Sequence, residues 1–302
     1  MISRRGILKT LAGALVGAFG FAGYAFSIEP GHRLVTTRYR IRPEGWPDAM
    51  KLRIAVISDL HASEPQMGMK RIEEVVRHTN ALKPDLILLL GDYGVGQTIY
   101  ARAVPTADVA RALSGLSAPL GRFGILGNHD YWGTSLRGWP YTEKKVNETA
   151  QKYRDMLATA GIRLMENDTV RLTHDGQPFW LIGTGSMIAL PIKARKFRSF
   201  ADLPGQLARI TDDAPAILMA HEPDLFPTVP KRIGLTLSGH THGGQVRLFG
   251  YSPITPSEFG NRYAYGHIVE DGRNLVVSGG LGTSAFPVRF GVPPEIVLID
   301  LG

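Results

Sequence analysis

The 302-residue sequence contains no cysteine, which excludes a disulfide scaffold and a thiolate metal site. Beyond residue 27, no apolar run is long enough to cross a bilayer. The 34 Lys and Arg residues do not form clusters interleaved with aromatic residues, so no nucleic-acid track is evident. The net charge of +7 therefore favours an anionic substrate or a lipid surface as partner.

Five short polar segments each follow an apolar, strand-like run. They hold five of the nine histidines of the chain. The segments are Asp59-Leu60-His61, Gly91-Asp92, Gly127-Asn128-His129-Asp130, His221 and Gly239-His240-Thr241-His242. Ligands of an open α/β sheet bind beyond the carboxyl ends of its strands, so these groups are expected to meet at one edge. Imidazole, carboxylate and amide groups at that density predict a metal site for two ions.

Strand-like and helix-like segments alternate along most of the chain, which indicates an α/β fold. The expected strands are 35–42, 54–58, 86–90, 123–126, 216–220, 234–238 and 296–300. The expected helices are 66–82, 106–116, 143–160 and 202–211. Because segments from residue 59 to residue 242 must meet in space, we expect one catalytic domain over residues 28–302.

In their order along the chain, the five segments resemble the signature of the calcineurin-like metallophosphoesterase superfamily, D-x-H, GD, GNH[DE], H and GHxH. The resemblance covers roughly residues 50–300. It implies an αββα sandwich, in which two stacked mixed sheets are flanked by helices and the metal site lies at the carboxyl ends of the strands. It also implies that the protein is a hydrolase of phosphate esters.

The same resemblance implies two divalent cations that share Asp92. The first cation is held by Asp59, His61, Asp92 and His242, and the second by Asp92, Asn128, His221 and His240. Such a pair activates a water for attack on phosphorus. Nitrogen and oxygen ligands suit Mn, Fe or Zn alike.

His129 has no metal in this assignment. The resemblance implies that it stabilises the transition state and protonates the leaving oxygen. For Asp130 two interpretations stay open, a partner that orients His129 and a brace of the loop. The other histidines are interpreted as surface or structural residues: His32, His78, His174 and His267.

The second segment and the C-terminal stretches indicate which branch of the superfamily the chain resembles. Protein Ser/Thr phosphatases continue the second segment as GDxxDRG, whereas Val95 and Gly96 stand here in place of that Asp and Arg. The extension of the fifth segment through Val246, and the stretches 278–284 and 294–296, resemble small bacterial phosphoesterases with a twin-arginine signal or membrane anchor. This branch favours a phosphodiesterase, and the monoester reaction remains open.

Residues 1–27 are interpreted as a targeting segment. Residues 3–9 resemble the twin-arginine signal S-R-R-x-F-L-K, with Ile7 in place of Phe, and the run from Thr10 to Ser27 is apolar and rich in Gly and Ala. We expect the twin-arginine machinery to export the folded protein to the periplasm or to the outer face of the cytoplasmic membrane. The 18-residue run is borderline between a cleaved signal and an anchor, and both outcomes stay open.

Two alternative functions are weighed against the exported phosphodiesterase. One is a membrane-associated hydrolase of a lipid-linked phosphate or pyrophosphate, similar to the UDP-diacylglucosamine hydrolases. The export signal counts against that particular reaction, because its nucleotide-sugar substrate is cytoplasmic. The other is a non-catalytic envelope protein with a structural metal, against which the unassigned His129 argues, since a structural site needs no acid at an open position.

Two stretches are candidates for substrate contacts. Residues 131–148 begin beside His129 and are rich in aromatic side chains, which either contact the substrate or pack as a surface loop. Residues 189–200 hold four basic side chains, which either face membrane phosphates or remain solvated.

Overall fold

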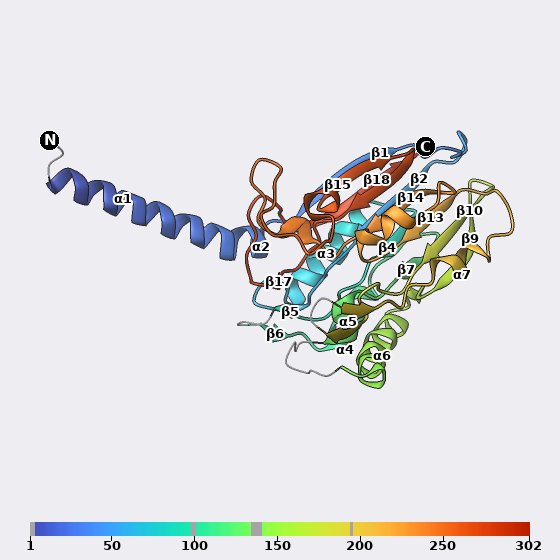
Figure 1. The fold of residues 1–302 in the computed structure, drawn as a ribbon, viewed down its shortest axis with the longest axis horizontal. Helices are drawn as coiled ribbons and strands as arrows, with labels where there is room; N and C mark the ends of the chain where they lie inside the picture. Colours follow the sequence, from blue (N-terminus) through green and yellow to red (C-terminus); the bar gives the residue numbers. More distant parts are fainter. Residues whose placement is uncertain (1–3, 98–100, 134–140, 194–195) are drawn as a thin grey trace.

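The computed structural model describes residues 4–97, 101–133, 141–193 and 196–302, and it contains two six-stranded sheets (Figure 1). The first sheet has the order β1 (Val35–Ile41), β18 (Glu295–Leu301), β2 (Leu52–Ile57), β4 (Leu86–Leu89), β7 (Arg122–Gly124) and β8 (Arg163–Leu164). The second has the order β15 (Gly266–Glu270), β16 (Arg273–Val277), β14 (Ile233–Ser238), β13 (Ala216–Met219), β10 (Gln177–Gly183) and β9 (Asp168–His174).

Both sheets are mixed. In the first, β18 and β2 are antiparallel, whereas the other neighbouring pairs are parallel. In the second, the outer strands β15 and β9 are antiparallel to their neighbours, and the inner pairs are parallel. The parallel strands that precede the polar segments therefore end at a common edge.

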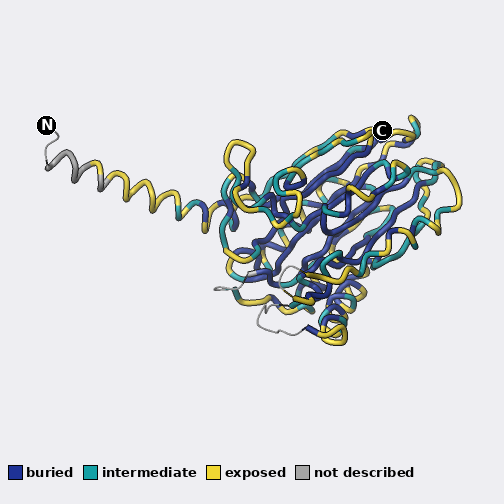
Figure 2. The backbone as a smooth tube through the Cα atoms, viewed as in Figure 1, coloured by how far each residue is buried: buried dark blue, intermediate teal, exposed yellow. Residues whose placement is uncertain are grey.

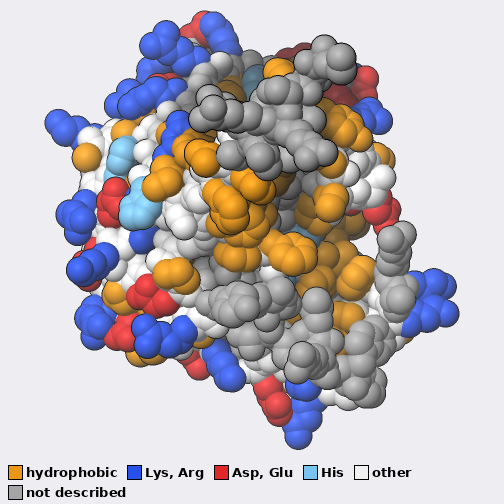
Figure 3. Space-filling view, turned by 90° about the vertical axis from the view of Figure 1, so that its left-hand side faces the viewer, with side chains coloured by type: hydrophobic (Ala, Val, Ile, Leu, Met, Phe, Trp, Pro, Cys, Tyr) orange, Lys and Arg blue, Asp and Glu red, His pale blue; other side chains and the backbone are white. Residues whose placement is uncertain are grey.

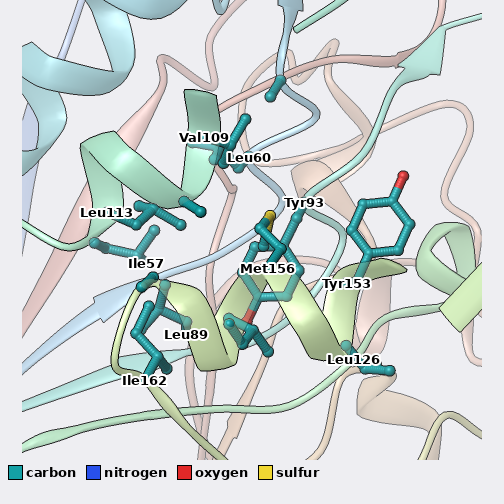
Figure 4. Close-up of a cluster of buried hydrophobic side chains, with 14 of the residues drawn as sticks. Ile57, Leu60, Leu89, Tyr93, Val109, Leu113, Leu126, Tyr153, Met156 and Ile162 are labelled. Carbon is teal, nitrogen blue, oxygen red and sulfur yellow. The ribbon is translucent and has the colours of Figure 1, made fainter. Parts of the chain in front are cut away.

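The apolar strands are buried on both faces, which explains their uninterrupted hydrophobic runs. In β2, Ile54 and Val56 enter the core between the two sheets, while Ala55 and Ile57 enter the core beneath the helices of the first sheet. Strand β4 alternates in the same way. Figure 4 shows the helix-side core, in which Ile57 lies among side chains from the helices that cover the sheet.

Helices cover the outer faces of both sheets. Those over the first sheet are α3 (Met69–Ala81), α4 (Thr106–Leu113) and α6 (Glu143–Thr159). The second sheet packs against α7 (Leu203–Leu207) and the 3₁₀-helix η2 (Pro223–Thr228). The predicted αββα sandwich is therefore confirmed.

Short elements complete the fold near the common edge. They are β3 (Ser63–Glu64) with β6 (Arg102–Ala103), β5 (Gly96–Gln97) with β17 (Ser284–Ala285), β11 (Leu190–Lys193) with β12 (Lys196–Arg198), α5 (Asn128–Trp132), and the 3₁₀-helices η3 (His242–Gly244) and η4 (Gly260–Tyr263). The helix expected over 202–211 is shorter than predicted: it ends at Leu207, with Ala208 as its C-cap.

The N-terminal helix α1 (Arg4–Gly23) projects away from the sandwich, and its side chains from residue 13 to residue 21 are exposed (Figures 1 and 2). Among the residues that the structure describes, no helix is both long and apolar enough to cross a bilayer. The chain then continues as a π-helix, η1 (Tyr24–Ile28), and as α2 (Glu29–His32).

Residues 24–32 pack on the domain. Ala25 and Glu29 are 2% and 1% exposed. The Glu29 carboxylate accepts a hydrogen bond from the Val292 N–H at 2.9 Å, and the Ala25 carbonyl accepts one from the Arg289 N–H at 2.9 Å. Contacts with the sandwich therefore begin before residue 28, while the division of the chain at residue 27 remains a prediction.

These contacts predict that Glu29 stabilises the fold. Glu29→Ala leaves the buried Val292 N–H without its acceptor, so the free energy of unfolding should fall by about 1–3 kcal/mol. Urea unfolding measures this loss, with the exposed Glu73→Ala on α3 as the control that should change little. An unchanged unfolding midpoint for Glu29→Ala would mean that the segment does not dock as described.

Candidate metal centre

The five polar segments meet at the common edge, since β2, β4 and β7 are neighbours in one sheet and β13 and β14 in the other. Six of the seven predicted metal ligands are exposed by 2% or less: Asp59, His61, Asp92, Asn128, His221 and His242. His240 and His129 are partly exposed, so they lie at the opening of the site. The structure thus brings together every residue that the sequence assigned to the metals.

Asp92 lies at the centre of the cluster. Its Oδ2 is 3.2 Å from His221 Nε2, which belongs to the second sheet, and 3.5 Å from His61 Nε2, which belongs to the first. Its Oδ1 accepts the His129 N–H at 2.8 Å. Burial acts to raise the pKa of Asp92, but the charge of His221 and its hydrogen bond hold that pKa well below the usual value. The carboxylate is therefore ionised and faces both groups of ligands.

On one side of Asp92, the side chains of Asp59, His61 and His242 offer ligand atoms that all lie within 4.8 Å of one another. His242 Nε2 is 3.5 Å from Asp59 Oδ1 and 3.1 Å from His61 Nε2. The His61 and His242 rings stack with their centroids 5.0 Å apart. This group matches the ligands expected for the first cation.

On the other side, Asp92, His221 and His240 form a second group within the same 4.8 Å. Asn128 Oδ1 lies 3.2 Å from His221 Nε2, and the rings of His221 and His240 are 5.3 Å apart. This group matches the ligands expected for the second cation.

Backbone carbonyls orient two of the imidazoles toward the cluster. His61 Nδ1 lies 2.8 Å from the Gly94 carbonyl, and His221 Nδ1 lies 2.6 Å from the Leu90 carbonyl. An Nδ1–H donated to a carbonyl leaves Nε2 as the ligand atom, which is the usual arrangement of metal-binding histidines. Both Nε2 atoms face Asp92, so these donors suit divalent cations.

The pKa values of these imidazoles follow the same geometry. Burial lowers the pKa of His61, which keeps its ring neutral. Burial also acts to lower the pKa of His221, but the Asp92 charge raises it well above the usual value. A proton on His221 Nε2 would occupy the position that a cation takes, since metal binding to imidazole displaces a proton.

Five of the predicted ligands have left-handed backbone conformations. Their φ angles are 51° for Asp59, 43° for His61, 57° for Asp92, 68° for His240 and 52° for His242. Non-glycine residues with positive φ are uncommon and concentrate at functional sites. The sharp turns after the strands thus point these side chains inward.

Two motif glycines allow the turns to approach one another. A Cβ on Gly127 would lie 2.3 Å from Asp92 Oδ1, and a Cβ on Gly239 would lie 2.0 Å from Ser58 Oγ. Both distances are far below van der Waals contact. The glycines of the third and fifth segments are therefore required by the closeness of the ligands.

Asp130 holds two of these turns together. Its fully buried carboxylate accepts the backbone N–H groups of Asp92 at 2.8 Å, Tyr93 at 2.9 Å and Gly127 at 2.9 Å. Burial, together with the charge of Asp92, raises the pKa of Asp130 to about 7. Its observed partners are those expected of a loop brace.

The His129 ring lies at the opening of the site. Its centroid is 5.0 Å from that of His61 and 5.5 Å from that of Trp132, and its Nε2 lies 3.3 Å from Ser284 Oγ. Burial lowers the pKa of His129 to about 4, so the ring is neutral at pH 7. A neutral imidazole can donate one N–H to an oxygen of a bound phosphate.

Two residues that contact the site were not predicted from the sequence. Ser284 reaches His129 from β17. Arg289 is fully buried, donates to the carbonyls of Gly279 and Val292, and places Nη2 3.3 Å from His242 Nδ1. The one available signal was an isolated arginine within the otherwise apolar stretch 285–292.

The two candidate substrate stretches lie against one another. Tyr131 is fully buried and packs in the helix-side core, whereas Trp132 stacks on Phe197 of β12 with ring centroids 5.6 Å apart. Residues 134–140 and 194–195 of these stretches lie outside the described residues. Trp132 and Phe197 thus form an aromatic pair beside His129.

The histidines outside the segments make unrelated contacts. His78 bonds to Thr36, His174 lies 3.0 Å from the Lys51 carbonyl, and His267 lies 3.0 Å from Asn274. His32 is exposed.

Known proteins match this chain over most of their own length. The chain is 30% identical to the metallophosphoesterase YkuE of Bacillus subtilis, over 99% of this chain and 98% of the relative. It is 30% identical to the phosphodiesterase YaeI of Escherichia coli, over the whole of both chains. It is 27% identical to the UDP-2,3-diacylglucosamine pyrophosphatase LpxG of Chlamydia trachomatis, over 91% of each.

The profile of the calcineurin-like phosphoesterase family matches residues 52–244, which include all five polar segments. This match covers more than half of the chain and ends just after the last of the clustered histidines. The chain therefore belongs to the calcineurin-like phosphoesterase family and is a metal-dependent hydrolase of phosphoester bonds.

Proposed function

We propose that the protein is an exported phosphodiesterase that uses two divalent cations. The observation that carries the proposal is the Asp92 carboxylate, which lies between two groups of candidate ligands. When bound there, two cations would polarise the phosphoryl group and lower the pKa of the attacking water. Asp59, His61 and His242 would hold one cation, and Asn128, His221 and His240 the other, with Asp92 shared.

Side chains of the protein bind the substrate, stabilise the leaving oxygen and hold the site in position. The substrate phosphate binds at the opening of the site, next to His129. The N–H of the His129 ring donates to the leaving oxygen and stabilises the charge that develops there. Ser284 Oγ lies 3.3 Å from His129 Nε2 and holds the ring in this orientation until a substrate oxygen replaces the contact. Asp130 keeps the turns of the second and third segments in register.

The aromatic pair Trp132 and Phe197 supports a diester with an apolar or planar leaving group. Phe197 is 38% exposed, and Trp132 lies 5.5 Å from the His129 ring, so a leaving group at His129 meets aromatic surface. The similarity to the phosphodiesterase YaeI supports the same reaction.

A lipid-linked phosphate or pyrophosphate is the second candidate substrate. The similarity to LpxG, a UDP-2,3-diacylglucosamine pyrophosphatase, favours it, and so does the exposed Ile192 on β11, which follows the Pro191 that pairs with Phe197. Parallel assays with a soluble aryl phosphodiester and a dispersed lipid pyrophosphate separate the two candidates by their kcat/KM values.

His129→Ala should lower kcat for a soluble phosphodiester by about 10²–10³-fold, the usual cost of removing one preorganised hydrogen-bond donor to developing charge. The metal content should stay near that of the wild type, because His129 holds no cation in this arrangement. Steady-state kinetics and elemental analysis check both expectations, and His267→Ala serves as the control away from the site. Loss of a metal ion in His129→Ala would show that its ring is a ligand.

Replacing both Arg4 and Arg5 by lysine should trap active enzyme in the cytoplasm, because the twin-arginine route requires the arginine pair and not merely its charge. Fractionation of cells, followed by phosphodiesterase assays of each fraction, measures the distribution. Arg111→Lys on α4 is the control for an arginine replacement that should not alter export. Normal delivery of the double variant to the envelope would contradict the twin-arginine route.

A further inference from the structure

Large apolar side chains are exposed around the base of helix α1. Phe249 is 108% exposed, Ile254 80% and Tyr251 61%. The same holds, to a lesser degree, for Phe21, Phe26, Ile28, Leu248 and Phe286. Figure 3 views the molecule from the side of α1 and shows hydrophobic side chains gathered at the middle of this face. We call the surface formed by residues 15–28, 245–256 and 284–292 the apolar face.

The three segments of the apolar face are joined by direct contacts. The Phe290 ring lies 4.7 Å from that of Phe21 and 6.1 Å from that of Tyr24, at the end of α1. The Arg247 N–H donates to the Phe290 carbonyl at 2.8 Å, which ties the second segment to the third. Helix α1 therefore leaves the domain from within this surface.

Phe249 lies at the tip of a tight hairpin, in a turn position where phenylalanine is unusual. Leu248 and Tyr251 exchange two backbone hydrogen bonds, and the two residues between them have φ angles of 50° for Phe249 and 82° for Gly250. Positive φ at both positions is the type I′ turn, which prefers Asn-Gly. A bulky side chain at positive φ strains the backbone. Because Phe249 is fully exposed, no packing within the chain offsets this strain. We therefore infer that its side chain contacts a partner outside the chain.

The charge of the apolar face indicates what this contact is. Residues 15–28, 245–256 and 284–292 contain no Asp or Glu, whereas the chain as a whole contains 27. Helix α1, which leaves from this face, also carries no acidic residue and has three basic residues in its first half. An apolar surface without carboxylates, joined to a helix whose first half is basic, suits the interface of an anionic bilayer.

We propose that the apolar face docks on an anionic lipid bilayer and that Phe249 and Ile254 enter its interfacial region. This docking also brings the metal centre near the lipid surface. Gln245, at the edge of the face, accepts the Ser284 N–H through Oε1 at 2.7 Å, and Ser284 contacts His129. The docking goes beyond the proposed reaction and does not depend on it.

The hairpin offers a variant that removes the apolar side chain without harming the fold. Phe249→Asn places the preferred residue at the type I′ position, so the unfolding midpoint should stay constant or rise. Partitioning of the full-length protein onto phosphatidylglycerol vesicles should fall about tenfold, as expected when one large apolar side chain no longer enters the interface. Val269→Asn on β15, exposed by 59% in the wild type, is the matched control and should partition like the wild type.

A fluorescent probe separates contact by the hairpin from contact by α1 alone. Phe249→Trp should gain a blue-shifted emission that brominated phosphatidylglycerol quenches, whereas Val269→Trp should not. Equal partitioning of Phe249→Asn and the wild type, or no quenching of the new tryptophan, would overturn the proposal. A third result would also overturn the proposal. If the wild type sediments as a dimer, and Phe249→Asn dissociates that dimer but still binds vesicles, the apolar face contacts a second copy of the chain and not a bilayer.

An assay of soluble phosphodiester hydrolysis tests the proposed function separately from the proposed docking on a bilayer. Phe249→Asn should hydrolyse it at the wild-type rate, because the hairpin lies outside the metal centre. A wild-type protein that binds vesicles but hydrolyses no phosphodiester would contradict the proposed function and leave the docking intact.

Discussion

The Asp92 carboxylate lies between histidines of two different sheets, and the rest of the site is arranged around it. An ionised carboxylate that is 1% exposed needs compensating positive charge. Without a cation, only a protonated histidine can supply that charge, and the raised pKa of His221 reflects this. Two cations would satisfy the same carboxylate and also use the imidazole nitrogens on either side. The need to compensate one buried charge therefore explains why ligands from both sheets converge.

The fold keeps the ligands together although the backbone of several of them is strained. Five ligand residues have positive φ, at a cost of order 1–3 kcal/mol each, in a domain whose net stability is only about 5–15 kcal/mol. Doubly buried strands hold the ends of the turns, and Asp130 ties two turns together through backbone hydrogen bonds. Arg289 links His242 to the docked segment that contains Ala25, because its side chain contacts His242 and its backbone N–H donates to the Ala25 carbonyl. The segment that follows α1 is thus connected to the site through one arginine.

The α/β class and the clustering of the polar segments could be predicted from local patterns in the sequence, whereas the αββα sandwich was implied by the resemblance to the family. Apolar runs ending in Asp59 or Asp92 indicate strands and their carboxyl ends. The sequence did not predict the residues whose place in the site depends on long-range packing. Ser284 lies in the two-residue strand β17 and Arg289 in an irregular stretch, so neither has a periodic pattern around it, and only the folded chain brings them to His129 and His242. Asp130 could have oriented His129 or braced the loop, and the difference depends on side-chain direction, which spacing does not determine.

The central claim is that Asp92 is shared by two cations. Crystals of the full chain grown with Mn²⁺ test it most directly, through anomalous diffraction at the manganese edge. The account predicts two anomalous peaks about 3.5–4 Å apart, with Asp92 between them, and one remaining peak or none in Asp92→Asn. A single peak in the wild type, or two full peaks in Asp92→Asn, would contradict it.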